Sequence, residues 1–165
     1  TLADGLVRTG YRNLTVVDLA TSALDLAQQR LGDRAPTVKW IAGDVLSYDF
    51  PRASCDVWHD RAVFHFLTDP QERARYVAQV SRSVAPGGHV LVATFAEDGP
   101  LRCSGLTVAR YSPEALHGEF GADFRLIESQ REVHRTPSGA TQAFTYCLCR
   151  YEPQGVPHTE PRADA

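Results

Sequence analysis

The sequence lacks methionine, long apolar runs and any leader-like segment at its start. A translated chain needs an initiator, so a chain that begins with Thr1 is expected to lack an upstream part of the gene product. No apolar run approaches the ~20 residues that a membrane-spanning helix needs, and the basic and apolar regions of a secretory signal are missing. These absences predict a cytoplasmic protein with no membrane segment.

Cysteine pairs of the C-x-x-C type are also absent. The four cysteines, Cys55, Cys103, Cys147 and Cys149, lie in apolar or strand-like surroundings. Such spacing indicates neither a zinc site nor a disulfide framework. Because free cysteine tends to be buried, we expect four small, reduced core residues and no bound metal.

The chain has no concentration of positive charge. It has 17 Lys and Arg against 20 Asp and Glu, a net charge of −3, and its arginines are scattered among acids. Nucleic-acid binding needs a basic face, so no nucleic-acid partner is indicated. A chain of 165 residues, 43% hydrophobic, is long enough for one globular domain with a proper core.

What the sequence does contain is an alternation of short apolar runs and helix patterns. Apolar runs that end at Asp18, at Asp44 and at His59 and Asp60 are predicted as strands, and "HVLVATF" at 89–95 as another. A helix is expected between the first two, with Thr21 as N-cap and Gly32 at its end. This rhythm predicts a doubly wound, Rossmann-like α/β sheet that is mostly parallel.

The clearest helix signal follows the third of these strands. Asp69 suits the N-cap, Pro70 the first helical position and Glu72 the second half of a capping box, and valines follow at helical spacing. A shorter helix is expected at about 112–120.

The end of the chain departs from the alternation. The runs "FRLIESQREV" and "AFTYCLCRY" have only the turn "RTPSGAT" between them, which predicts an antiparallel hairpin. The last residues are rich in proline and have no apolar periodicity. We therefore expect one domain over residues 1–151 and a disordered tail over 152–165.

Polar residues stand at three of the predicted strand ends. Asp18 closes the first strand, Asp44 the second, and His59, Asp60 and Arg61 the third. In open α/β sheets ligands bind beyond the carboxyl ends of the strands, so these side chains are expected along one edge. One acid there can accept the hydroxyls of a ribose and another an exocyclic amino group, which suits an adenosine.

At this point the sequence resembles the class I S-adenosylmethionine-dependent methyltransferases. The motifs that carry the resemblance occur in family order and are "TVVDLA", "AGDV", "VAPGGHVLVATF" and the final hairpin. It implies S-adenosylmethionine as cofactor, with Asp18 and Leu19 at its ribose, Asp44 facing adenine and Val45 packed beside it.

The stretch "WHDRAV", with "ERARYV" after it, resembles in particular the thiopurine and small-thiol branch. Protein-lysine methyltransferases of the same fold carry a comparable acid and base there. Asp60, Arg61 and His65 are the candidate catalytic residues, and His59 is expected beside the cofactor. Two plainer readings stay open, in which Asp60 and Arg61 pair with each other and His65 is a hydrogen-bonded core residue.

One element of the family pattern has no counterpart in the sequence. The family's first strand and glycine-rich loop would precede Thr1, and that strand would lie between the strands that end at Asp18 and Asp60. We expect either a longer gene product or a homodimer that exchanges this strand.

The predicted function is methyl transfer to a small-molecule acceptor. The alternatives are a binding or interaction module that keeps a truncated methyltransferase fold without catalysis, a protein-lysine methyltransferase, and a dinucleotide oxidoreductase. The "PGG" strand followed by a terminal hairpin argues against the oxidoreductase.

Overall fold

A computed structural model describes residues 2–136 and 139–154. They divide into two compact units, the N-terminal unit Thr1–Asp49 and the C-terminal unit Phe50–Ala165, and each is described by itself. The predicted tail falls mainly on residues 155–165, outside the described part. Its first residues are ordered, because the backbone N–H groups of Glu152 and Gln154 donate to Asp123.

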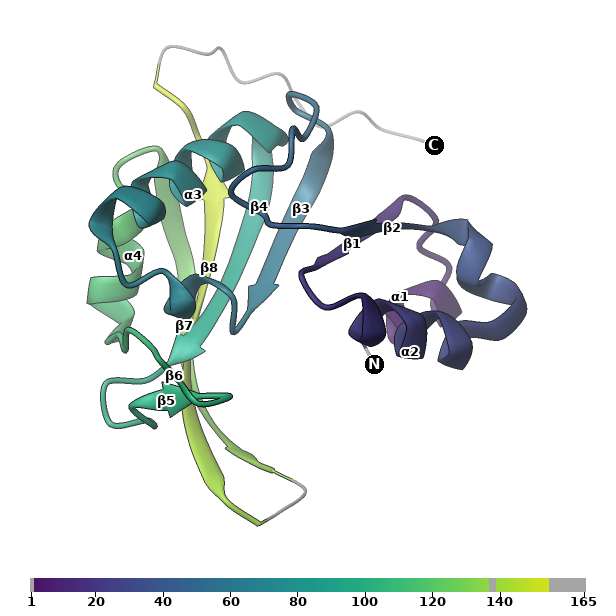
Figure 1. Ribbon diagram of the computed structural model, residues 1–165. Coiled ribbons are helices and arrows are strands. Elements are labelled where there is room, and N and C mark those ends of the chain that lie inside the picture. Colours follow the sequence, from purple (N-terminus) through teal and green to yellow (C-terminus); the bar gives the residue numbers. More distant parts are fainter. Residues whose placement is uncertain (1, 137–138, 155–165) are drawn as a thin grey trace. The chain divides into compact units, whose positions relative to one another are not determined.

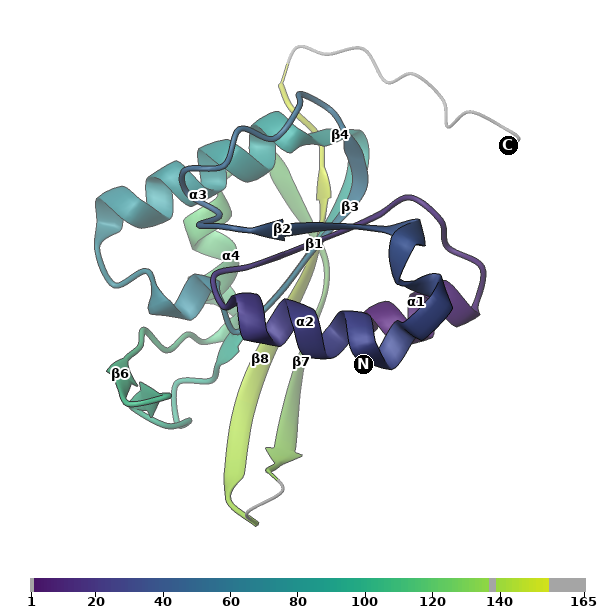
Figure 2. The same ribbon diagram turned by 45° about the vertical axis from the view of Figure 1, so that its right-hand side comes forward.

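The N-terminal unit is a small α/β layer. Leu14 pairs with Val38 and Asp18 with Ala42, so β1 and β2 run parallel and end side by side. Figures 1 and 2 both show the two helices on the same side of this pair, where Arg30 and Asp4 join them by an ion pair of 3.1 Å. Its elements are α1 (Leu2–Arg8), β1 (Leu14–Asp18), α2 (Thr21–Leu31), the 3-10 helix η1 (Gly32–Thr37) and β2 (Val38–Ala42).

The prediction of Thr21 as the N-cap of α2 is wrong. Ala20 occupies the cap position with no side-chain hydrogen bond, and Thr21 is already the first helical residue. Asp18 explains the shift, because its Oδ1 accepts from the backbone N–H of Ala20 at 2.8 Å. This hydrogen bond forms the turn that leads into the helix, and it lies before the first helical residue.

The C-terminal unit is a four-stranded sheet in the order β3-β4-β8-β7. The strands β3 and β4 are parallel, and the predicted hairpin adds β8 and β7 in antiparallel fashion. The far end of the hairpin projects as a two-stranded ribbon (Figures 1 and 2). Its elements are β3 (Cys55–Arg61), the 3-10 helix η2 (Phe64–Phe66), α3 (Pro70–Ser83), β4 (Val84–Phe95), β5 (Arg102–Cys103), β6 (Leu106–Thr107), α4 (Pro113–Phe120), β7 (Phe124–Arg135) and β8 (Thr141–Tyr151).

Both α helices of this unit cover one face of the sheet (Figure 1). Their contribution is aromatic: the ring of Phe64, which is fully buried, lies 5.1 Å from that of Tyr76 on α3 and 5.5 Å from that of Phe120 on α4. Buried aromatic rings provide a large share of a small core's stability, so this cluster fixes η2, α3 and α4 against the sheet.

The helix α3 begins as the sequence predicts. Asp69 is the N-cap and accepts from the backbone N–H of Gln71 at 2.8 Å, and Pro70 is the first helical residue. Glu72 departs from the expected capping box, since its carboxylate lies 3.8 Å from Arg75 on the next turn.

The strand β4 starts earlier than predicted and includes the "PGG" stretch. Cys55 pairs with Val84 but Val57 pairs with His89, so β4 carries an irregularity across residues 85–88. Gly88 is required there, because a Cβ at this position would lie 2.8 Å from the carbonyl oxygen of Asp56 on the neighbouring strand.

The α/β prediction is confirmed, and the strands form separate sheets in the two units. In the described chain β1 pairs only with β2, and β3 only with β4, so each keeps one unpaired edge. In these two sheets β1–β2 and β3–β4 are parallel, and β4–β8 and β8–β7 are antiparallel. The described sheets are therefore mixed, whereas the sequence predicted a mostly parallel sheet.

The cysteines are free thiols, as expected. Cys147 and Cys149 are buried, and burial raises their pKa values to about 11 and about 12, so they stay protonated. Cys55 and Cys103 are only partly buried. Among the described helices, none combines the length and apolar character that crossing a membrane would require.

Candidate functional site

The acids of the N-terminal unit stand at neighbouring strand ends. Asp18 is the last residue of β1, level with Ala42 on β2, and the backbone N–H of Gly43 donates to the Asp18 carbonyl at 3.0 Å. Asp44 follows one residue later and folds the chain into a turn, because its Oδ1 accepts from the N–H of Leu46. The structure thus places Asp18 and Asp44 at the same edge of the β1–β2 pair.

Each of these carboxylates uses one oxygen to shape its turn. For Asp18 and for Asp44 the second oxygen, Oδ2, has no partner among the described residues, and Asp18 is exposed. Leu19, directly after Asp18, is 76% exposed, and Val45 is half-buried. Free carboxylate oxygens beside uncovered apolar side chains fit the polar edge and flat faces of an adenosine.

The end of β3 in the C-terminal unit separates its polar residues between two faces. Successive side chains of a strand point to opposite sides, so Trp58 and Asp60 face α3 while His59 and Arg61 face the other side. The exposures agree: Asp60 is 5% exposed, whereas His59 and Arg61 are exposed. The possibility that Asp60 and Arg61 pair with each other is therefore excluded.

Asp60 is fully engaged by its own surroundings. Its Oδ1 accepts from the N–H of Val63 at 2.9 Å, and its Oδ2 accepts from the N–H of Phe64 at 3.0 Å and from the Tyr76 hydroxyl at 2.6 Å. Burial raises the pKa of this carboxyl, and the hydrogen bonds from Tyr76, Val63 and Phe64 act in the opposite direction. Asp60 thus ties the end of β3 to η2 and α3.

Two residues of this network were not found from the sequence. The Tyr76 hydroxyl donates to Asp60 and accepts from the indole N–H of Trp58 at 2.9 Å. Trp58 lies two residues before Asp60, on the same face, and Tyr76 is fully buried on α3. The spacing of Asp60 and Tyr76 in the sequence carries no signal of the contact, which depends on how α3 packs.

His65 is completely buried on η2, between the rings of Phe66 and Phe95. Its Nδ1 accepts from the backbone N–H of Phe95 at 3.4 Å, which places the ring proton on Nε2, and Nε2 has no hydrogen-bond partner among the described residues. Burial lowers the pKa of His65 to about 4, so the ring is neutral at pH 7. This environment favours the plainer reading of His65, a core residue that positions η2.

Arg61 is fixed in direction although it is exposed. Its Nε donates to the Tyr146 hydroxyl on β8 at 3.1 Å, and its guanidinium carbon lies 4.3 Å from the centre of the Phe144 ring. No hydrogen bond or ion pair to another described residue is formed by its two Nη groups.

His59 is exposed on the same face as Arg61, two residues earlier along β3. Partial burial of its ring lowers the pKa of His59, and the positive charge of Arg61 acts in the same direction. A neutral imidazole at pH 7 can accept a proton, so His59 is available as a base on this face.

The chain turns sharply directly after Arg61. Ala62 has a φ of 68°, a conformation that costs a non-glycine residue about 1 to 3 kcal/mol. It is held there by its own N–H, which donates to the carbonyl of Ala93 at 2.9 Å, and by the anchoring of Val63 and Phe64 on Asp60. The network around Asp60 therefore sustains the turn that presents Arg61.

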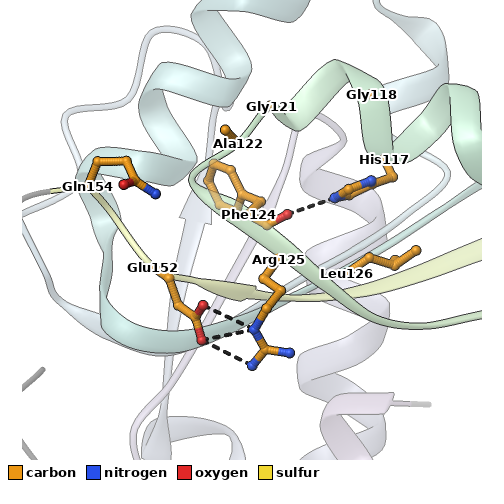
Figure 3. Close-up of a pocket in the computed structure, with 9 residues that line it drawn as sticks. All are labelled: His117, Gly118, Gly121, Ala122, Phe124, Arg125, Leu126, Glu152 and Gln154. Carbon is orange, nitrogen blue, oxygen red and sulfur yellow. Dashed lines mark hydrogen bonds and ion pairs between the residues drawn. The ribbon is translucent and has the colours of Figure 1, made fainter.

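A pocket lies beside the start of β7 and the end of β8 (Figure 3). It measures about 560 Å³, and Arg125 and Glu152 inside it form a two-pronged ion pair with distances of 3.0 to 3.1 Å. Because these charges satisfy each other, the pocket offers no free charged group to a ligand. Its lining residues are His117, Gly118, Gly121, Ala122, Phe124, Arg125, Leu126, Glu152 and Gln154.

In the described part of the chain, no three His, Cys, Asp or Glu side chains are grouped so that they could hold a metal ion. Among the predicted site residues, those with polar atoms open to a ligand are Asp18 and Asp44 in the N-terminal unit, and His59 and Arg61 in the C-terminal unit.

Comparison with known proteins gives a family match. Residues 1–88, more than half of the chain, match the family model described as "Methyltransferase domain". The curated eEF1A lysine and N-terminal methyltransferase of Bos taurus is 23% identical over 162 residues, which are 92% of this chain and 22% of that protein. The ubiquinone/menaquinone biosynthesis C-methyltransferase UbiE of a Ruegeria species is 27% identical over 134 residues, 76% of this chain and 52% of that one. The chain thus spans about a fifth and about half of these relatives.

The fold has counterparts among solved structures. A SAM-dependent methyltransferase of Methanosarcina mazei superposes with a TM-score of 0.72 at 16% identity, covering 91% of this chain and 86% of that one. At this identity the likeness concerns the fold.

Proposed function

Because the chain belongs to the methyltransferase-domain family, we propose that it binds S-adenosylmethionine and takes part in methyl transfer to a small-molecule acceptor. Family membership and fold confirm the resemblance to class I enzymes that use this cofactor. The thiopurine and small-thiol branch stays a prediction.

The observation that carries the proposal is the pair of acids in the N-terminal unit. Asp18 would accept the ribose hydroxyls through its free oxygen, and Asp44 would accept the adenine amino group. Leu19 and Val45 would pack against the adenosine. Because their turns are already formed by hydrogen bonds to Ala20 and Leu46, these carboxylates need little reorganisation on binding.

Held by Asp18 and Asp44, S-adenosylmethionine would supply a methyl group on a sulfonium. The acceptor's electron pair would form the new bond to carbon, and the pair of the broken bond would stay on the sulfur of S-adenosylhomocysteine. The chain then has to align the acceptor and exclude water, which contributes several kcal/mol. If the acceptor carries a proton, His59 can take it, since its ring is neutral and exposed.

Among the three residues first considered catalytic, Arg61 is the one whose donors are open to an acceptor. Asp60 and His65 are buried and do not face an acceptor. Asp60 holds the turn that follows Arg61, and His65 packs η2 against Phe95. We propose positioning roles for these two residues.

A protein-lysine acceptor is the second candidate. The similarity to the eEF1A lysine and N-terminal methyltransferase favours it. Methyl transfer from labelled S-adenosylmethionine to small thiols and phenols, compared with a lysine peptide, separates the two. Label in a small acceptor and none in the peptide is expected, whereas label only in the peptide would establish the alternative.

A further inference from the structure

We infer that Arg61, set in place by Phe144 and Tyr146 on β8, binds an anionic group of the acceptor, so that the acceptor is an acid with a flat, aromatic-like part that is ionised at neutral pH. The inference rests on the proposed function and adds the acceptor's class. Phe144 and Tyr146 are then positioning residues for Arg61.

The first observation is the way in which Arg61 is held. Arg61, Ala93 and Tyr146 lie in one row across β3, β4 and β8, because Arg61 pairs with Ala93 and Ala93 pairs with Tyr146. The Tyr146 hydroxyl takes the Nε proton, and the Phe144 ring takes one face of the guanidinium. Fixing a flexible arginine costs conformational entropy, and in Arg61 the contacts with Phe144 and Tyr146 already restrict the side chain. Its two Nη groups stay free, and this edge of a guanidinium can bind a carboxylate through two parallel hydrogen bonds.

The second observation is that Arg61 has no acidic partner among the described residues. The adjacent acid, Asp60, points to the opposite face and is saturated by Val63, Phe64 and Tyr76. Other arginines of the C-terminal unit do pair with carboxylates. They are Arg73 with Glu119, Arg75 with Glu72, Arg125 and Arg150 with Glu152, and Arg131 with Asp98. Arg61 thus carries a charge without a described acidic partner at the carboxyl end of the parallel strands, where ligands of α/β proteins bind.

The third observation is the apolar border beside this charge. Ala93, Phe95, Val108 and Phe144 form a buried cluster. Ala62, Phe66, Cys103 and Tyr146 pack against it and are only partly buried. An aromatic or otherwise flat acceptor could contact these exposed parts while its anionic group reaches the Nη edge.

The charge also discriminates between the two candidate acceptors. A lysine side chain is a cation at neutral pH, so it would meet repulsion from Arg61, whereas a carboxylate or thiolate would be attracted. Arg61 would further stabilise the ionised form of an acidic acceptor and so favour the nucleophilic state.

The test compares an anion with its neutral counterpart in the full chain. Phenylacetate and phenylacetamide have the same shape and differ in charge, and calorimetry or ligand-observed NMR measures their dissociation constants. We expect phenylacetate to bind in the millimolar range and at least about tenfold more tightly than phenylacetamide. Arg61→Gln should abolish that preference, and Arg61→Lys should retain part of it because the charge stays while the fork is lost.

Tyr146→Phe tests the positioning role. It removes the acceptor of the Nε proton but keeps the ring, so the preference for phenylacetate should fall several-fold while phenylacetamide binding is unchanged. A purely structural role would weaken both ligands together. Arg75→Gln, which removes an exposed arginine on α3, is the matched control and should keep the full preference.

Binding of S-adenosylhomocysteine to the same samples keeps the two proposals apart. If wild type binds S-adenosylhomocysteine but Arg61→Gln leaves the preference for phenylacetate intact, the inference is overturned and the proposed function stands. If wild type binds no S-adenosylhomocysteine, the proposed function fails. Loss of the preference in Arg61→Gln with unchanged S-adenosylhomocysteine affinity supports the inference.

Discussion

Asp18 is the last residue of β1 and Asp60 the last but one of β3, yet their surroundings differ. Asp18, in the N-terminal unit, is exposed and keeps one carboxylate oxygen free. Asp60, in the C-terminal unit, is 5% exposed and accepts three hydrogen bonds. An acid with a free oxygen can bind a ligand, whereas a saturated and buried acid holds its own chain. We therefore propose that the ligand at the end of β3 is met by Arg61, the neighbour of Asp60.

The largest effect on stability is expected when Asp60 is replaced. Asp60→Ala leaves the N–H groups of Val63 and Phe64 and the Tyr76 hydroxyl buried without their acceptor, so the free energy of unfolding should fall by about 3 to 5 kcal/mol. Urea unfolding measures it. Asp56→Ala, which removes an exposed acid from the same strand, is the control and should change stability by less than about 0.5 kcal/mol. Equal losses in both variants would contradict the role given to Asp60.

The buried neutral ring of His65 predicts a pH dependence of stability. Its pKa in the folded chain is about 4, against about 6.5 in the unfolded chain. Between these values the unfolded chain binds a proton that the folded chain does not. The contribution of His65 to the free energy of unfolding is therefore fully present above pH 6.5, and the free energy of unfolding falls by about 3 kcal/mol as the pH drops to 4. Urea unfolding across this range should show a shallower loss in His65→Leu. The same slope in both chains would count against a buried neutral His65.

The hydroxyl of Tyr76 should contribute less than the carboxylate of Asp60. Tyr76→Phe removes the donor to Asp60 and the acceptor of the Trp58 N–H, for a loss of about 1 to 3 kcal/mol in the free energy of unfolding. Tyr11→Phe, at a residue that is 62% exposed, is the matched control and should be neutral. A neutral Tyr76→Phe would remove this residue from the network.

The smallest effect is expected at the turn after Arg61. Ala62 and Ala53 have φ values of 68° and 47°, so glycine relieves backbone strain at both. Each substitution should change stability by less than about 1 kcal/mol. Only Ala62→Gly should loosen Arg61 and lower the preference for phenylacetate over phenylacetamide. An equal effect of Ala53→Gly on this preference would contradict the link between the strained turn and Arg61.

The sequence predicted those features of the fold that depend on residues close together in the chain, such as helix caps and tight turns. Asp69 and Pro70 at the start of α3, and the hairpin of β7 and β8, are confirmed. The short pair β5 and β6 was not predicted, because two-residue strands have no periodicity to detect. Thr21 was misassigned as a cap because the hydrogen bond from Ala20 to Asp18 lies outside the helix.

The sequence predicted which residues stand at the strand ends of the candidate site, and it did not predict the contacts that those residues make. Strand ends are readable from a sequence, so Asp18, Asp44 and Arg61 were located. Which acid keeps a free oxygen depends on tertiary contacts, such as that of Asp60 with Tyr76 from another element. The partners of Arg61 on β8, Phe144 and Tyr146, lie more than 80 residues further along the chain, as the sequence separation of 85 between Arg61 and Tyr146 shows.

We propose that Asp18 binds the cofactor and that Asp60 does not. Calorimetric titration with S-adenosylhomocysteine tests it most directly, in protein expressed from the complete reading frame, with Asp18→Ala and, as a matched exposed acid of α2, Asp25→Ala. We predict that wild type and Asp25→Ala bind alike and that Asp18→Ala binds about 10- to 100-fold more weakly, the value of hydrogen bonds to a charged group. Unchanged affinity in Asp18→Ala, or no binding by wild type, would contradict the account.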